Sequence, residues 1–334
     1  MPNGEQRNRP QGHGDDGLPL SAPAKQSILV TGATGYLASA LCGAISQAYW
    51  NVLRGGRIAL STQEVNWLAY GDLGQKPLVN GLLAGIDIVV HFAGKAHVEP
   101  TTKAIATARI SNVEGTRYLV EASAEAGVRR FIFISSALVL EGSIDDAGWI
   151  NDDCIPNPKS VYGQLKSEAE EIVRDVSEAA GMEWVIVRPP MVYGPRSPGN
   201  LKRLIQLVAT GLPLPLASAA APKSFVFVDN LISALKILLD HPAVGNQTLL
   251  VADNEALSTA ELIRTIAACN GQSPRLFPFP QKLLRAIAGL ANRSSDIDRL
   301  FKPLALNASR IKTLTGWEPP YTAQEGLVAT LQKN

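Results

Sequence analysis

The sequence predicts an α/β fold in which helices cover both faces of a parallel sheet. Three observations favour this class. Short apolar runs alternate with helical patterns of ten or more residues between residues 27 and 188, which is typical of strand–helix–strand units. The run at 130–135 contains four successive apolar residues, 131–134, as expected of a strand buried on both faces. The first run, 27–31, stops at a glycine turn that a helical pattern follows.

The order of the remaining elements extends this pattern. After the first strand we expect strands at 57–61, 86–91, 130–135 and 184–188, and helices at 102–126 and 161–180. Beyond residue 189 the alternation fades. Helical patterns at 199–210, 229–240, 258–269, 280–291 and 323–332 mix there with strand candidates at 224–228 and 247–251. This part of the chain predicts a smaller second unit that contributes mainly helices.

Composition excludes several classes of protein. The 334 residues are 46% hydrophobic and 18% charged, so a sizeable core is expected. A net charge of +1 gives no overall field that would gather nucleic acid or an anionic membrane surface. No run of about 18 apolar residues occurs, and the polar stretch 1–26 reads as a flexible tail without a signal peptide, so we expect a cytoplasmic protein. Cys42, Cys154 and Cys269 are scattered, which predicts reduced thiols and no metal site.

The turn after the first strand has the pattern of a phosphate-binding loop. Residues 31–38 read T-G-A-T-G-Y-L-A. Its glycines let the backbone turn sharply and approach a pyrophosphate, which then lies at the helix amino terminus. We therefore expect a Rossmann-type dinucleotide-binding domain at 27–190 and a mainly substrate-binding cap at 191–334, with one strand or helix of the cap free to rejoin the first domain. The candidate cofactor contacts in the loop are Gly32, Thr34, Gly35, Tyr36 and Leu37.

Three further motifs follow the loop in order: G-D-L at 71–73, H-F-A-G at 91–94 and N-V-E-G-T at 112–116. Together with the loop they resemble the extended short-chain dehydrogenase/reductase (NAD-dependent epimerase/dehydratase) family. The resemblance implies that the adenine lies beside the G-D-L motif, that the H-F-A-G strand end borders the cofactor, and that the asparagine of the third motif supports the active site. The implied cofactor contacts are Asp72, Leu73, Phe92, Ala93, Gly94, Asn112 and Pro189.

A tyrosine and a lysine stand four residues apart in Tyr162-Gly-Gln-Leu-Lys166, and hence on one face of a helix. A nearby ammonium lowers the pKa of a phenol, so we expect Lys166 to lower the pKa of Tyr162. Ser136 closes the buried strand 26 residues earlier. Ser135 is its rival, and the family pattern favours Ser136. The expected chemistry is hydride transfer between nicotinamide C4 and a carbinol or carbonyl carbon. In it Tyr162 moves the proton, Ser136 polarises the oxygen, and Lys166 tunes the phenol and holds the nicotinamide ribose.

The end of the expected second strand bears on the choice between NAD and NADP. An NAD site places an acid there, about 20 residues past the glycines. Ser61 and Thr62 stand at that end, and the nearest acid is Glu64. No arginine there clearly matches a 2′-phosphate either. The sequence favours NADP weakly and leaves NAD open.

The segments at 188–195, 211–216 and 223–230 resemble those of nucleotide-sugar members of the family, as does the N-A-S-R run that ends at Arg310. The implied substrate contacts are Lys95, Ser136, Tyr162, Asn200, Lys223 and Arg310, with Arg203 and Arg299 as further candidates for the diphosphate. Lys223 stands where many epimerases carry arginine, and it lacks the planar fork of that residue. Ala137 and Leu138 replace the Asp-Glu pair of 4,6-dehydratases, which disfavours a dehydratase.

With K-A-H-V at 95–98, these motifs are most similar to bacterial 4-reductases of UDP-4-keto-6-deoxy-N-acetylhexosamines, which serve surface-polysaccharide synthesis. The expected function is therefore an NAD(P)H-dependent reductase of such a nucleotide sugar. The alternatives are a UDP-sugar 4-epimerase with retained NAD, an NADPH reductase of steroid- or flavonoid-like carbonyls, and a non-catalytic cofactor-binding protein. The resemblance also implies a homodimer formed through the helices at 102–126 and 161–180.

Overall fold

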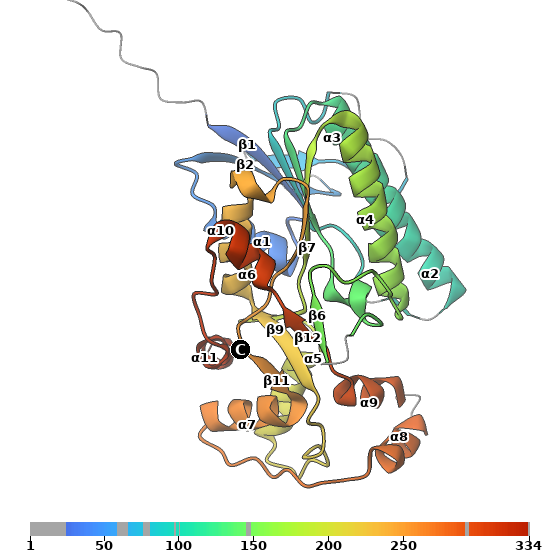
Figure 1. Cartoon of the computed structure of the whole chain (residues 1–334), viewed down its shortest axis with the longest axis vertical. Coiled ribbons are helices and arrows are strands. Elements are labelled where there is room, and N and C mark those ends of the chain that lie inside the picture. The colour runs from blue at the N-terminus through green and yellow to red at the C-terminus, as the bar shows by residue number, and fades with distance from the viewer. Residues whose placement is uncertain are drawn as a thin grey trace, which may run out of the picture.

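A parallel seven-stranded sheet forms the centre of the molecule (Figure 1). The computed structural model describes residues 25–58, 66–75, 81–96, 98–99, 101–144, 148–290 and 294–332. The strand order is β10-β7-β5-β4-β1-β2-β3. The bounds are β1 (Gln26–Thr31), β2 (Trp50–Gly56), β3 (Trp67–Ala69), β4 (Ile88–His91), β5 (Arg130–Ile134), β7 (Glu183–Arg188) and β10 (Gln247–Leu250).

Helices cover both faces of this sheet, which confirms the predicted fold class. On one face lie α1 (Tyr36–Ala44), α6 (Val228–Leu238) and α10 (Ser309–Thr315), and on the other α2 (Thr102–Arg109), α3 (Gly115–Glu125) and α4 (Val161–Ala180) (Figure 1). Alternate side chains of one strand serve the two faces. In β5, Ile132 belongs to the core under α1 and α6, and Phe131 and Phe133 belong to the core under α3 and α4. All five β5 residues are buried, as the apolar run predicted.

The strand order reverses between β1 and β4. From β1 the chain moves outward to β2 and β3, and then returns to build β4, β5, β7 and β10 on the other side. In open α/β sheets, ligands bind outside the carboxyl ends of the strands at such a switch point. The topology therefore points to a site between the ends of β1 and β4, where the glycine loop and the H-F-A-G motif lie.

The second strand is not where the sequence analysis expected it. We predicted 57–61, but β2 spans Trp50–Gly56, and residues 59–61 lie outside the described part. The true strand ends in Gly55 and Gly56, whose α-carbons face the rings of Tyr70 and Trp67 so closely that a Cβ would lie 2.8 and 2.2 Å from ring carbons. Glycine in a strand interior is usually unfavourable, and here the two aromatic rings fill the space.

The predicted helix 102–126 is present but interrupted. A π-helical segment, Ile110–Glu114, separates α2 from α3. Such bulges occur frequently at functional sites, and this one contains Asn112.

The remaining elements lie mostly beyond residue 190. A three-stranded sheet has the order β11-β9-β8, from β8 (Met191–Tyr193), β9 (Pro222–Phe227) and β11 (Ala256–Ser258). β12 (Ala305–Asn307) pairs with β6 (Trp149–Asn151). The helices of this region are α5 (Asn200–Ala209), α7 (Thr259–Cys269), α8 (Gln281–Gly289), α9 (Ser294–Phe301) and α11 (Ala323–Gln332). β10 lies in the main sheet beside β7; the division into domains at residue 190 stays a prediction.

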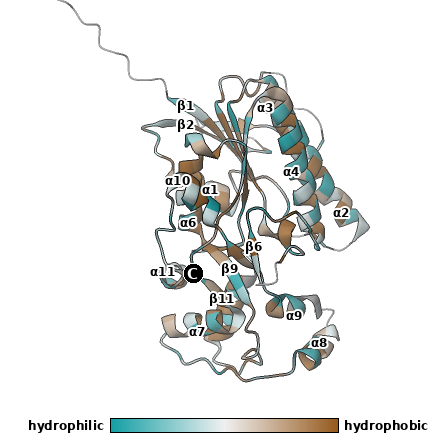
Figure 2. Cartoon of the chain, viewed as in Figure 1, coloured by the Kyte–Doolittle hydropathy of each residue, from teal (hydrophilic) through white to brown (hydrophobic). Residues whose placement is uncertain are grey.

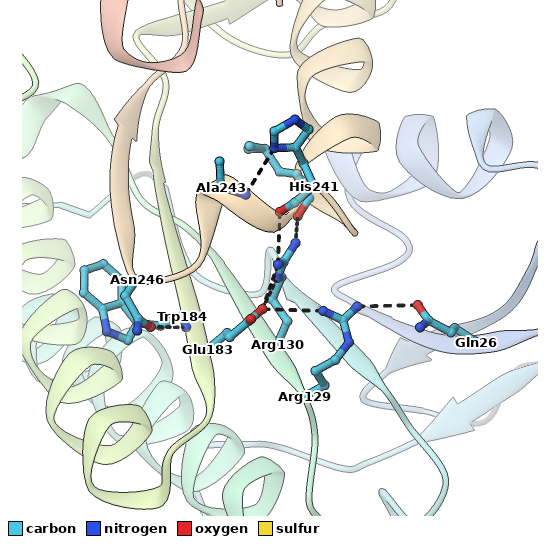
Figure 3. A network of polar contacts seen from close by, with 9 residues as sticks. Gln26, Arg129, Arg130, Glu183, Trp184, His241, Ala243 and Asn246 are labelled. Atoms are coloured by element: carbon cyan, nitrogen blue, oxygen red, sulfur yellow. Dashed lines mark hydrogen bonds and ion pairs between the residues drawn. The ribbon is translucent and has the colours of Figure 1, made fainter. Parts of the chain in front are cut away.

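A buried arginine connects the end of α6 to the end of the sheet at which β5 and β7 begin (Figure 3). Arg130 is 1% exposed. Its Nε donates to Glu183 at 2.7 Å, and its terminal nitrogens donate to the carbonyls of Leu238 and His241 at 2.9 and 3.1 Å. Leu238 is the last residue of α6 and His241 lies three residues further on, so the arginine lies at the carboxyl end of the helix, where a cation is favourable. The network lies at the end of the sheet opposite the switch point.

None of the described helices is long and apolar enough to cross a membrane. Among the described residues no group of three or more potential metal ligands comes together, and Cys42, Cys154 and Cys269 are free thiols.

Candidate active site

The glycine loop connects β1 to α1 at the switch point. Gly32 has φ of +68°, a region that favours glycine, and its carbonyl accepts from Gly35 N at 2.7 Å. A Cβ on Gly32 would lie 3.1 Å from the backbone nitrogen of Ala93. Gly35 precedes α1, whose first turn has neither a capping side chain nor an acid. The free N–H groups of this turn suit a pyrophosphate.

His91 ends β4 beneath this loop and is fully buried. Its Nδ1 lies 2.7 Å from Thr31 Oγ1, and its Nε2 lies 3.1 Å from Thr116 Oγ1. Because the Thr116 hydroxyl donates to the Asn112 carbonyl at 2.7 Å, it accepts from Nε2–H, and Nδ1 accepts from Thr31. Burial lowers the pKa of His91 to about 3, with the Lys166 ammonium as a smaller cause. His91 is thus a neutral structural link between β1, β4 and α3.

Asn112 fixes the loop that follows β4. Its side chain is 1% exposed. Its Oδ1 accepts from Lys95 N at 2.7 Å and its Nδ2 donates to Lys95 O at 3.0 Å. Gly94 lies beneath this amide with φ of +154°, and a Cβ there would lie 3.2 Å from Asn112 Oδ1. The π-helical bulge thereby holds the backbone of Gly94 and Lys95 at the mouth of the site.

Lys166 reaches the same place from α4. Its ammonium is buried, donates to the Ile134 carbonyl at 2.8 Å and lies 4.5 Å from the centre of the Phe133 ring. A Cβ on Gly94 would lie 3.8 Å from Lys166 Nζ, so the ammonium lies close to the Gly94 backbone. Burial lowers the pKa of Lys166 to about 8, and the carboxylate of Glu170 opposes that shift.

Tyr162 lies in the first turn of α4, which Ser160 caps by accepting from Gly163 N. Burial raises the pKa of Tyr162 to about 12, so the expected lowering by Lys166 is wrong for this structure. The physical reason is that burial dominates and the ammonium is directed at the Ile134 carbonyl. Next to Tyr162, a Cβ on Gly163 would lie 2.6 Å from the Leu138 carbonyl, so glycine lets α4 approach the loop after β5.

The two serines after β5 have different partners. Ser135 is buried and its hydroxyl donates to Glu170 Oε1 at 2.5 Å. Ser136 is half-buried and its Oγ accepts from Leu138 N at 3.2 Å, which starts the short 3-10 helix Ala137–Leu140. The hydroxyl hydrogen of Ser136 therefore stays available to donate to a substrate oxygen, whereas Ser135 serves the interior.

A buried ion cluster behind the site was missed by sequence reasoning. Glu170, 0% exposed, accepts from Arg188 Nε at 2.9 Å and from its terminal nitrogen at 2.6 Å, and from Arg174 at 3.1 Å. The cluster joins α4 to the ends of β5 and β7. The signal available in the sequence was an acid four residues after Lys166, on the same helix face.

The residues expected at the adenosine end of the site were those that follow a strand at 57–61. Because β2 ends at Gly56, other residues lie at that strand end. Tyr70, one residue past β3, accepts from Gly32 N–H at 2.9 Å through its hydroxyl. Burial raises the pKa of Tyr70, and the hydrogen bond from Gly32 and the positive charge of Arg57 oppose that shift. Arg57 directly follows β2, at the carboxyl end of that strand. Asp72 is exposed and accepts from Gly74 N at 3.2 Å. The previously considered Ser61, Thr62 and Glu64 lie outside the described residues.

The other predicted cofactor contacts lie around the same strand ends. Thr34 is exposed, and Tyr36, Leu37, Phe92 and Ala93 are half-buried. Leu73 is buried in the core under α3 and α4. Pro189 is buried and its carbonyl accepts from Ala137 N at 2.9 Å, which links the end of β7 to the Ser136 loop.

The predicted substrate contacts are more scattered. The Lys223 ammonium donates to the carbonyls of Arg299, at 2.8 Å, and Lys302, at the end of α9. Arg310 pairs with Asp153 and donates to the Thr248 carbonyl at 3.4 Å. Asn200 begins α5, with its side chain outside the described atoms, and the side chains of Lys95, Arg203 and Arg299 are exposed. The structure does not gather these residues, and their contacts with substrate stay predictions.

Comparison with known proteins adds independent findings. Residues 28–252 match the model of the NAD dependent epimerase/dehydratase family. The chain is 34% identical over 312 residues to a UDP-glucose 4-epimerase of Vibrio cholerae, covering 92% of this chain and 95% of the relative. A ceramide reductase of Caulobacter vibrioides (strain NA1000 / CB15N) is 26% identical, with 90% and 88% covered. The fold is similar to that of a UDP-glucuronic acid 4-epimerase from Bacillus cereus in complex with NAD, with a TM-score of 0.74, 22% identity, and 92% and 96% of the two chains covered.

Proposed function

The chain belongs to the NAD dependent epimerase/dehydratase family, and from this premise we propose that it is an NADPH-dependent reductase of a 4-keto nucleotide sugar. The substrate class is a UDP-4-keto-6-deoxy-N-acetylhexosamine. The observation that carries the proposal is that Ser136 follows β5 and the Lys166 ammonium lies against the Ile134 carbonyl at the end of the same strand. Tyr162 stands one helical turn before Lys166 on α4. A cytoplasmic homodimer formed through the faces of α2, α3 and α4 completes the proposal.

The side chains of the site suit reduction. The nicotinamide, when bound, supplies the hydride. A phenol whose pKa is raised to about 12 is protonated at neutral pH, so Tyr162 is ready to donate its proton to the alkoxide that forms at C4. The Ser136 hydroxyl donates to the same oxygen and orients it. We expect Lys166, whose buried ammonium lies against the Ile134 carbonyl, to hold the nicotinamide ribose when the cofactor is bound.

The residues around the adenosine end favour NADPH. Within the described residues of β2 and its end, 50–58, there is no aspartate or glutamate that could bind the two ribose hydroxyls of NAD. Tyr70 accepts the N–H of Gly32 through a neutral hydroxyl, and Arg57 supplies a positive charge there that suits a 2′-phosphate. We propose that Arg57 and Tyr70 together form the 2′-phosphate end of the cofactor site.

A 4-epimerase that retains NAD is the second candidate. It is favoured by the 34% identity with a UDP-glucose 4-epimerase over almost the whole chain. Such an enzyme would use the same three residues twice, first to oxidise C4 and then to reduce it from the other face.

Mass spectrometry of dinucleotide released from the denatured protein separates the two candidates. Loss of cofactor on purification, with NADPH consumption on a UDP-4-keto-6-deoxy-N-acetylhexosamine, supports the reductase. Near-stoichiometric NAD, with interconversion of UDP-glucose and UDP-galactose and no net NADPH consumption, would replace it by the epimerase. Arg57→Ala, compared with Lys236→Ala at an exposed position of α6, should raise the KM for NADPH at least tenfold.

A further inference from the structure

Helix α8 carries apolar side chains that the rest of the described chain leaves in solvent. Leu283, Ile287 and Leu290 are 54%, 57% and 91% exposed, and no residue of α8 is buried. We call these three residues the α8 stripe. In Figure 2, α8 lies at the lower edge of the molecule and shows both brown and teal along its length.

The stripe is one face of an amphipathic helix. Its members are separated by four and three residues, so they project from the same side. Lys282 and Arg285 project from the other side. Leu284, at the edge of the apolar face, packs against the core together with Phe301. Leu284 therefore fixes α8 to the cap, and the stripe beside it faces outward.

The segment around the stripe is basic. Residues 262–290 contain no acidic residue, although the whole chain has 31 basic and 30 acidic residues. The basic residues of the segment are Arg264, Arg275, Lys282 and Arg285. Within the described part of the chain Arg285 pairs with Asp298, whereas Lys282 and Arg275 are exposed and form no ion pair. Figure 1 shows α7, α8 and the connection between them along the lower end of the molecule.

We propose that the α8 stripe and this basic segment form a docking surface for an anionic lipid bilayer. A helix with Leu and Ile on one face and Lys and Arg on the other lies in the membrane interface, with its apolar face among the acyl chains and its cations near the headgroups. α8 has nine residues, too few to span a membrane. An open groove of about 410 Å³, whose lining includes Phe279, Gln281 and Phe301, adjoins its first turn.

A second copy of the chain is a poorer occupant of this surface. A two-fold contact places the same patch on both sides, so it would bring two segments together that each have only basic residues. Three side chains of one short helix also offer much less than the roughly 800 Å² per partner of a stable interface. A bilayer with anionic headgroups satisfies both the apolar stripe and the charge.

Vesicle cosedimentation of the full chain tests the proposal, independently of catalysis. The vesicles are phosphatidylcholine alone, or phosphatidylcholine with one quarter phosphatidylglycerol, at low and high salt. The double variant Ile287→Ser/Leu290→Ser is compared with Tyr49→Ser/Ile155→Ser, which removes two side chains of 75% and 82% exposure elsewhere. Circular dichroism checks that both variants fold.

We expect the wild-type chain and the control variant to sediment with anionic vesicles, and the α8 variant to partition at least about tenfold more weakly. High salt should weaken binding as well. No sedimentation of the wild type, equal sedimentation of both variants, or equal binding to neutral vesicles would overturn the proposal. A dimer in light scattering that the α8 variant abolishes would assign the stripe to a second copy and overturn it too.

Discussion

Replacing His91 by glutamine should remove a large part of the acid sensitivity of the fold. His91 is fully buried between Thr31 and Thr116, and both bonds require the neutral ring with its proton on Nε2. Burial lowers the pKa of His91 from 6.5 to about 3. Between these two values the unfolded chain binds a proton that the folded chain excludes, so stability rises with pH through this window and is lost as pH falls below 6.5.

The magnitude follows from the width of the window. Each pH unit below 6.5 costs about 1.4 kcal/mol, so the free energy of unfolding should fall by about 2 kcal/mol between pH 6.5 and about pH 5 through this one residue. Asp152 and Asp253 act in the opposite sense, because burial raises the pKa of each carboxyl. The quantity to measure is therefore the difference between wild type and variant.

Urea unfolding followed by tryptophan fluorescence, at several pH values between about 5 and 7, gives this difference. The His91→Gln protein should be less stable than wild type at pH 7, because its packing changes, but it should lose about 2 kcal/mol less on acidification. The control is His241→Gln, which replaces a half-buried histidine three residues after α6. Its free energy of unfolding should change with pH as that of wild type does. If the free energies of unfolding of wild type and His91→Gln fall in parallel with pH, His91 does not contribute to the acid sensitivity of the fold.

Three substitutions test other parts of the structure. Glu170→Gln should destabilise the fold by about 3 kcal/mol, because it leaves buried arginine without its carboxylate; an unchanged urea midpoint would contradict this. Gly163→Ala should lower kcat at least tenfold with the fold retained, because the added Cβ would lie 2.6 Å from the Leu138 carbonyl, next to Tyr162 in the sequence. Steady-state kinetics measures kcat and circular dichroism checks the fold. A wild-type kcat would contradict the expected effect of this contact. Arg130→Met should lower the free energy of unfolding by about 3 kcal/mol, because the hydrogen bonds of Arg130 to Glu183 and α6 are lost. Its kcat should not change, because Arg130 lies at the end of the sheet opposite the active site. A lower kcat in folded protein would show that the two ends of the sheet are coupled.

The fold was predictable where one strand or helix carries its own signal. β5 is apolar at nearly every position, so its burial on both faces could be read directly. β2 could not be located, because Asn51, Arg54 and two glycines interrupt its apolar pattern, and the rings of Trp67 and Tyr70 that fill the glycine positions come from β3 and the residue that follows it. The three-residue strands β8, β11 and β12 are too short to show a period.

The candidate site was predictable in its backbone motifs and less so in its charges. The strand end and the helix spacing predict that Ser136, Tyr162 and Lys166 lie near one another, and the structure places the Lys166 ammonium at the end of β5, which Ser136 follows. The pKa of Tyr162 depends on how deeply the fold buries the phenol and on which group accepts the hydrogen bond of the Lys166 ammonium. Both depend on tertiary contacts that the local sequence does not predict. Lys223 also has a long flexible side chain, and the position of α9, set by cap packing, decides its partner.

Transfer of deuterium from NADPH to the sugar tests directly whether the chain reduces C4 with Tyr162 as its proton donor. The chain is incubated with UDP-4-keto-6-deoxy-N-acetylhexosamine and each of the two stereoisomers of C4-deuterated NADPH, and the product is analysed by mass spectrometry and NMR. We expect one deuterium at sugar C4 from one of the two isomers, and none with Tyr162→Phe. A product without deuterium from either isomer, or an equally labelled product from Tyr162→Phe at the wild-type rate, would contradict it.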